Sequence, residues 1–327
     1  MVFLFRDKSV INILFLIILS LLVHAHFFFV APVLLGSVNE GLFAVFLFHY
    51  FSSIDTTFLF ILYLAALLIQ AIRLNMLLME LKMFQKLGYT VAMSYVLLSG
   101  FFISWTAITP ALFANFLLIW LFIKITRLFN QPNPKNLLFN IGLIVGSTIL
   151  CYHPTAILII VVLFTLGIMR PFKLQEWFVL LMGIALPYYL LGSWLFLNDR
   201  LGEIYAYLPH WALVVPAVKM DAAFIVGISV LAIAFIVGFI CWQQFNSRLV
   251  IQIRKNWSAM LLMCLILLAV PFVFRDGGLP AAFMCILPLS VFISNAFSYP
   301  QKLFLPNLLF WGMFGVVMYN NWQIIKF

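Results

Sequence analysis

Charged side chains are scarce in this sequence. Asp, Glu, Lys and Arg make up only 8% of the 327 residues, whereas apolar residues make up 66%, and the mean hydropathy is +1.18. Soluble domains carry about 25% charged residues. A chain with so little polar surface cannot cover itself in water. The composition therefore excludes an ordinary soluble domain and predicts a protein whose solvent is lipid.

Cysteine is scarce as well. Cys151, Cys241, Cys264 and Cys285 are far apart and form no CxxC, so we interpret them as small apolar residues and expect no metal and no cofactor. The net charge of +9 is spread over many short segments instead of one patch. This spread argues against nucleic acid as a partner.

Several catalytic motifs are also missing. The chain has no Walker motif, HExxH, GxSxG or GxGxxG, which argues against ATPases, zincin proteases and dinucleotide enzymes. Its apolar runs lack the regular ionisable side chains that proton pumps and ion-coupled transporters place at mid-membrane. We interpret the neutral polar residues inside these runs as hydrogen-bonding groups between helices.

Long apolar runs are what the sequence does contain. They are continuously apolar, without the alternation of barrel strands, and most approach the roughly 20 residues that a crossing helix needs. We predict an all-α, polytopic transmembrane bundle that forms a single domain over 1–327. The eleven runs are approximately 9–30, 57–79, 89–105, 109–123, 137–151, 154–169, 177–197, 222–241, 257–273, 279–297 and 303–320.

The basic residues predict the orientation of this bundle. If all eleven runs cross, the N-terminal segment and the even-numbered connections share one side. All of the 18 lysine and arginine residues except Arg200, Lys219, Arg275 and Lys326 fall on that side. The positive-inside rule then predicts a cytoplasmic N-terminus and a periplasmic C-terminus. Six of the nine acidic residues and all five histidines fall at or near the periplasmic side.

Two periplasmic connections are long. Residues 31–56 contain an apolar stretch, Leu42 to Phe51, that is too short to cross and is typical of an interfacial helix. Residues 198–221 carry aromatic side chains that suit the headgroup layer. The middle runs, 109–123 and 154–169, have only about 15 residues each, roughly 23 Å of helix against a core of about 30 Å. We expect a recess on their periplasmic side.

The chemistry-bearing side chains border this expected recess. A carboxylate near an apolar wall has a raised pKa and serves as a general base, and Glu40 and Asp55 are the candidates. Arg275 is a candidate phosphate contact, because arginine binds phosphate with two hydrogen bonds. For Arg275 and its neighbour the alternative is a solvated turn before Gly278. The remaining candidate substrate-binding residues are Asp276, His49, His153, His210 and Lys219.

Four stretches carry a resemblance to a family. They are "QAIRLN" (70–75), "TPALFANFLLIWLFIKITRLF" (109–129), "FNIGLIVGSTILCYHPTAIL" (139–158) and "MRPFKLQEWFVLLMGIALPYYLLG" (169–192). With them the chain resembles an uncharacterised family of polytopic inner-membrane proteins from the Bacteroidota, over about its first 200 residues. The resemblance implies a bacterial inner membrane and no particular activity.

The layout is also similar to GT-C-type glycosyltransferases, which use polyprenyl-phosphate sugars. They have a cytoplasmic N-terminus, an outer loop with surface helices and an acidic catalytic residue, and short middle helices below an outer cavity. Glu40 or Asp55 would match that acidic position. The loop 31–56 lacks the paired Asp-Asp or Asp-Glu that many such enzymes show.

Three functions stay open at this point. The first is a multi-pass inner-membrane protein of envelope biogenesis, with a GT-C-like glycosyltransferase acting on a polyprenyl-phosphate-linked sugar at the periplasmic face. The second is a non-catalytic subunit or scaffold of a secretion, motility or envelope complex. The third is a transporter of lipid or a small solute. The expected partners are membrane lipids, a polyprenyl-phosphate carrier, and other membrane proteins of such a complex.

Overall fold

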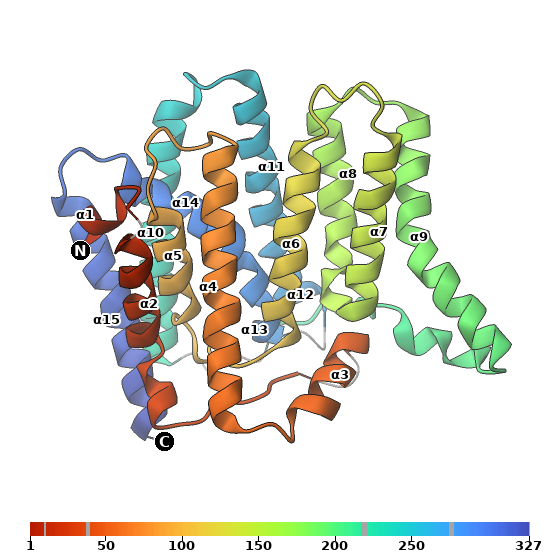
Figure 1. Ribbon diagram of the computed structural model, residues 1–327, viewed down its shortest axis with the longest axis horizontal. Coiled ribbons are helices and arrows are strands. Elements are labelled where there is room, and N and C mark those ends of the chain that lie inside the picture. The colour runs from red at the N-terminus through yellow and green to blue at the C-terminus, as the bar shows by residue number, and fades with distance from the viewer. Residues whose placement is uncertain (10, 37–39, 217–220, 275–277, 327) are drawn as a thin grey trace.

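The computed structural model describes residues 1–9, 11–36, 40–216, 221–274 and 278–326, and these residues form helices and no strand (Figure 1). Most of the helices run along one common direction, with the connections gathered at the two ends of the bundle. Two isolated backbone bridges, Leu34 with Ile108 and Trp211 with Phe274, join connecting segments. The prediction of an all-α chain is therefore confirmed for the described residues.

The α-helices are α1 Val2–Phe5, α2 Ile11–Val23, α3 Leu42–Phe51, α4 Thr56–Glu80, α5 Thr90–Ser99, α6 Pro110–Thr126, α7 Lys135–Cys151, α8 Leu158–Met169, α9 Leu174–Leu197, α10 Ala222–Asn246, α11 Ile251–Leu267, α12 Val270–Val273, α13 Gly278–Ala281, α14 Ile286–Ser298 and α15 Phe304–Lys326. Short 3-10 segments are η1 Ala25–Phe28, η3 Ile103–Trp105, η4 His153–Ile157, η5 Leu201–Tyr207 and η6 Ala282–Cys285.

Each of the eleven apolar runs overlaps at least one of these helices. Within the described residues, five stretches are long and apolar enough to cross a membrane: Thr56–Glu80, Leu174–Leu197, Ala222–Asn246, Ile251–Val273 and Gly278–Ser298. Several of the others, including α5 to α8, have 10 to 17 residues. The membrane-spanning character of the chain is thus supported by five helices, and the figure of eleven crossings stays a prediction.

Helices α5 and α14 form the centre of the bundle. Every residue of both is buried, and α5 packs against α14, α4 and α2. The hydroxyl groups of Thr90 and Ser298 form a hydrogen bond of 2.6 Å between α5 and the end of α14. Arg6, close to the N-terminus, donates from Nε to the carbonyl of Phe297 and from Nη2 to that of Pro300, each at 2.8 Å. Segments from both ends of the chain therefore close one core.

Helices α7 and α9 pack through glycine. A Cβ added to Gly142 or Gly146 of α7 would collide with backbone carbonyls of α9, and one added to Gly183 would collide with α7. Small residues four apart let two helix backbones approach closely, which is the usual way in which membrane helices associate. Glycine at these positions sets the distance between α7 and α9.

Proline bends α9. Pro187 lies inside the helix, where it lacks the N–H for the backbone ladder and crowds the preceding turn. Beyond it the helix turns away from the bundle, and η5 packs back against it (Figure 1). The outer half of α9 consequently exposes large apolar side chains, among them Tyr189 and Leu197.

The two ends of the bundle differ in charge. One end of the bundle holds the connections α4–α5, α6–α7, α8–α9 and α10–α11 (Figure 1), and we call it the basic end. Its basic residues include Lys82, Lys86, Arg127, Lys173 and Arg248. The opposite end of the bundle holds helix α3, segment η5 and the first turns of α4 and α10, and we call it the acidic end. The acidic end carries Glu40, Asp55, Glu203 and Asp221.

Candidate functional site

Glu40 is a buried carboxylate at the acidic end, just before α3. Only 5% of the residue is exposed. Among the acidic residues whose burial is described, Glu176 is the other buried one, and it is held by Arg170. Moving a carboxylate out of water costs several kcal/mol unless its charge and lone pairs are satisfied. Its retention inside this apolar chain makes Glu40 the first residue to consider for function.

The backbone before Glu40 is pinned to the entrance of α6. Leu35 N–H donates to Ile108 O at 3.1 Å, and Ile108 N–H donates to Val33 O at 3.0 Å. Gly36 follows, and a Cβ there would lie 3.3 Å from Glu40 Oε2 and 3.4 Å from Pro110 Cδ. The space beside the carboxylate therefore depends on a residue without a side chain at position 36.

The backbone after Glu40 is pinned to the end of α7. Gly41 has φ +129°, and a Cβ there would lie 2.6 Å from the carbonyl oxygen of Cys151, so only glycine is accommodated. This contact brings Glu40 close to Tyr152. Burial raises the pKa of Tyr152 well above its usual value, and the negative charge of Glu40 raises it further. Tyr152 is thus held as a neutral phenol.

The other candidate residues divide between this region and the surface. His153 is buried and directly follows Tyr152. Asp55 occupies the position before α4 and is exposed, and its Oδ1 accepts a hydrogen bond of 3.5 Å from Thr56 Oγ1. His49, on α3, and His210, in the segment 208–216, are exposed. The structure thus buries Glu40 close to Tyr152, the residue before the buried His153, and leaves the other three at the surface. Arg275, Asp276 and Lys219 lie outside the described residues.

His24 and His26 form a buried polar cluster that the sequence analysis did not distinguish from the other histidines. His24 Nδ1 lies 3.0 Å from Ser20 O, and its Nε2 lies 3.3 Å from the hydroxyl of Tyr63. His26 Nδ1 lies 2.5 Å from Asn321 Oδ1. The cluster joins α2, α4 and α15. Its members come from distant parts of the sequence, so no local spacing pattern could have revealed it.

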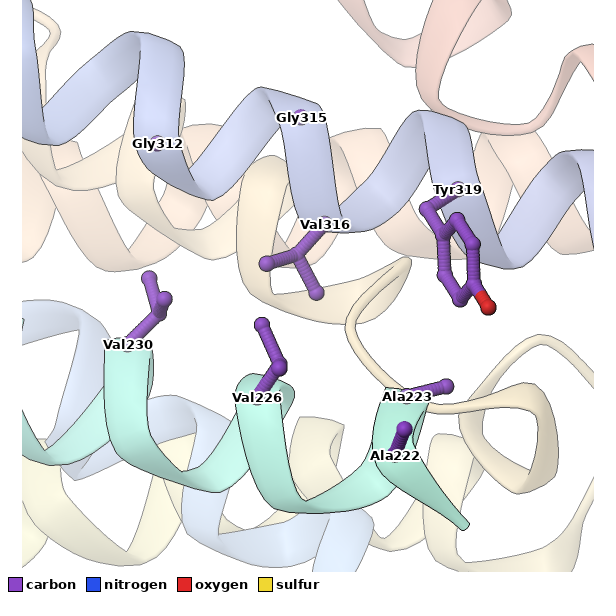
Figure 2. Close-up of a pocket in the computed structure, with 8 residues that line it drawn as sticks. All are labelled: Ala222, Ala223, Val226, Val230, Gly312, Gly315, Val316 and Tyr319. Carbon is purple, nitrogen blue, oxygen red and sulfur yellow. The ribbon is translucent and has the colours of Figure 1, made fainter.

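An apolar groove lies between α10 and α15 (Figure 2). Its volume is about 380 Å³, and Val226, Val230 and Tyr319 are among the residues that line it. Gly312 and Gly315 form part of the α15 wall, and a Cβ added to either would meet nothing within 4 Å. These glycines therefore leave room for another molecule instead of enabling close packing.

The groove continues at the acidic end into a mouth that adds a few polar side chains to mostly apolar walls. A second cavity of about 240 Å³ shares Ala223 with it and is lined by Asp221, Asn320, Gln323 and Ser104 among others. Together the two cavities form one amphipathic site, and from here on the name α10–α15 groove covers both of them. The carboxylate at its mouth is Asp221, and neither Glu40 nor Asp55 lines it.

One short segment connects this mouth to the region around Glu40. Ser104 lines the mouth, Ile108 pairs with Leu34 and Leu35, and Pro110 approaches Gly36 beside Glu40. Two carboxylates, Asp221 and Glu40, thus lie along the same segment of the acidic end. The first is exposed and the second is buried.

Comparison with family models, with curated proteins and with solved structures finds no match to this chain. The resemblances to a Bacteroidota membrane family and to GT-C enzymes therefore stay predictions from the sequence. The geometry of the described residues is what supports a functional proposal.

Proposed function

We propose that the protein is a multi-pass bacterial inner-membrane protein of envelope biogenesis that binds a lipid-linked polar substrate at its acidic end. The observation that carries this proposal is the α10–α15 groove, which joins apolar walls to a mouth containing Asp221, Asn320 and Gln323. A hydrocarbon or polyprenyl chain suits the walls, and hydrogen-bonding headgroup atoms suit the mouth. The basic end then faces the cytoplasm, by the positive-inside rule.

The reaction that fits this arrangement is glycosyl transfer from a polyprenyl-phosphate sugar, as in GT-C-like enzymes. Glu40 is the proposed general base; because it does not line the groove or its mouth, this role requires the acceptor to reach it along the segment that connects Ser104 to Pro110. Its carboxylate accepts the proton of an acceptor hydroxyl, the hydroxyl oxygen attacks the anomeric carbon, and the polyprenyl phosphate leaves with its bonding electron pair. The observation that supports this choice is the burial of the Glu40 carboxylate at the acidic end, close to Tyr152. Asp55 is the second candidate for the base.

A scaffold function is the other candidate, and one observation favours it. The outer half of α9 and the segment after η5 expose large side chains, with Leu213 at 91% and Val215 at 84%. Apolar surface of this kind at the acidic end suits another membrane protein as well as lipid. In this case the faces of α9 carry the function, and the acidic residues do not.

Two variants separate lipid binding from transfer. Gly315→Leu places a side chain in the groove, and its Cβ would meet nothing within 4 Å. We expect it to remove the lipid that the purified wild-type protein carries, as measured by native mass spectrometry. Glu40→Gln keeps the shape of the side chain and removes its basicity. We expect it to keep the lipid and to abolish envelope glycan formation in cells that depend on the variant.

The matched control is Asp199→Asn. Asp199 is exposed at the same end and has φ +56°, a conformation that asparagine tolerates. It should behave as wild type in both measurements. If Glu40→Gln, Asp55→Asn and Arg275→Gln all leave the glycans unchanged, the catalytic proposal fails and the scaffold remains. If the wild-type protein carries no lipid that Gly315→Leu removes, the lipid site itself is wrong.

A further inference from the structure

A polar cavity of about 590 Å³ lies at the basic end, opposite Glu40 and the mouth of the α10–α15 groove. Three helices each present one face to it. Arg73 and Glu80 come from α4, Arg127 comes from the end of α6, and Asn136 and Asn140 come from α7. Gln252 of α11 closes it. A chain that is 66% hydrophobic has concentrated amide and guanidinium groups around this one cavity.

The hydrogen-bonding groups of this cavity are available to a ligand. Within the described residues, the side chains of Arg127, Asn133, Asn136, Asn140 and Gln252 make no hydrogen bond and no ion pair. Arg73 makes one contact, from Nη1 to Glu80 Oε1 at 3.3 Å, and both side chains are exposed. Two arginines against one glutamate leave the lining with a net positive charge.

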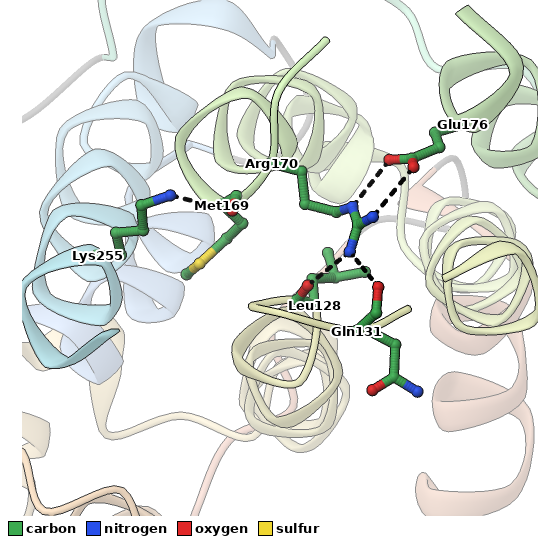
Figure 3. Close-up of polar contacts among 6 residues, drawn as sticks. All are labelled: Leu128, Gln131, Met169, Arg170, Glu176 and Lys255. Carbon is green, nitrogen blue, oxygen red and sulfur yellow. Dashed lines mark hydrogen bonds and ion pairs between the residues drawn. The ribbon is translucent and has the colours of Figure 1, made fainter. Parts of the chain in front are cut away.

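Arg170 binds two carbonyl groups of the loop that directly follows Arg127 (Figure 3). Its Nη1 donates to Leu128 O at 3.2 Å and to Gln131 O at 2.6 Å, while Nε and Nη2 bind the two oxygens of Glu176. All three nitrogens of Arg170 thus serve the structure. The loop 128–131 is held in place without any contribution from Arg127, whose donors remain open.

We infer that this cavity binds a phosphate ester that carries hydroxyl groups. Guanidinium binds phosphate oxygens in pairs, with charge-assisted hydrogen bonds. Asparagine and glutamine amides donate and accept at once, so the five that line this cavity suit hydroxyl groups better than a bare ion. This chemistry has two sources, the glycerophosphate headgroup of an anionic lipid and a soluble sugar or glycerol phosphate. The site is separate from the α10–α15 groove and does not depend on the function proposed for it.

The test uses the full-length protein in neutral detergent. Native mass spectrometry with phosphatidylglycerol and calorimetry with glycerol 3-phosphate distinguish the two sources. Arg127→Gln removes one charge at an exposed position, and we expect it to weaken binding about tenfold or more, as expected for loss of charge-assisted hydrogen bonds. Asn133→Asp places a carboxylate at the cavity with almost no change of shape and should weaken binding at least as much.

Arg248→Gln is the matched control, because Arg248 is an exposed arginine at the same end that does not line the cavity. Its affinity should equal that of the wild type, while higher salt should weaken binding of the wild type. Circular dichroism establishes that each variant is folded. The inference is overturned if the wild type binds neither probe, or if Arg248→Gln loses as much affinity as Arg127→Gln. A wild type that binds one probe, with loss in both cavity variants alone, supports it and names the source.

Discussion

The ion pair between Arg170 and Glu176 offers a measurable test of how burial sets the strength of charge pairs in this bundle. The two oxygens of Glu176 accept hydrogen bonds of 3.0 and 3.2 Å (Figure 3), and the side chains are 11% and 7% exposed. Removing one partner of a buried pair leaves an uncompensated charge and costs about 3–5 kcal/mol. Because Arg170 keeps two carbonyl acceptors after Glu176→Gln, we expect a loss near the lower limit, about 3 kcal/mol.

The chain contains its own control. Arg200 and Glu203 form a pair of the same bidentate geometry, at 2.8 and 2.7 Å, but with side chains 55% and 45% exposed. Water screens exposed pairs, and ordering two long side chains costs entropy, so Glu203→Gln should change stability little. The free energy of unfolding is measured in mixed micelles by titration with sodium dodecyl sulfate, with helicity as the signal. Equal losses for the two variants would refute the reasoning, because geometry and not burial would then set the energy.

Two further predictions concern the close approach of α7 to α9 at glycine and the titration of Tyr299. Gly146→Ala should destabilise the protein by about 1–3 kcal/mol, because the new methyl group collides with the carbonyl of Ile184, while Gly167→Ala has open space and should be neutral or stabilising in the same titration. Tyr299 is stacked on Phe245 at 4.3 Å, and burial first, then the nearby Cys241, raises its pKa to about 12. The neutral phenol therefore contributes stability that is complete below about pH 10 and is lost as the pH rises towards 12. Tyr299→Phe should remove this part of the alkaline destabilisation, and an unchanged pH profile would contradict the assignment.

The helices were predictable because their information is local. The surface stretch Leu42 to Phe51 folds as α3 with those same bounds, since a short apolar segment between polar ends has one way to satisfy its backbone. The position of Pro187 likewise indicates the bend of α9. What local sequence could not supply was the pairing of distant helices, as in the contact of Thr90 with Ser298.

The candidate site was predictable only in part. Glu40 was chosen for its place in the outer loop, and its burial depends on Gly36, Gly41 and the end of α7, which no local pattern brings together. The α10–α15 groove joins segments that are separated by more than eighty residues of sequence. Part of the polar cavity at the basic end was within reach, because Asn136 and Asn140 are four residues apart on one face of α7.

The central place of α14 has a consequence for biosynthesis. Helix α5 makes its main contacts with a segment that leaves the ribosome about two hundred residues later. Until then the hydroxyl group of Thr90 lacks its partner Ser298, and the amide of Asn115 lacks the carbonyl of Phe283 to which it donates. Maturation of this protein is therefore gated by its last third, and chains truncated before Ile286 should be recognised and degraded by membrane quality control.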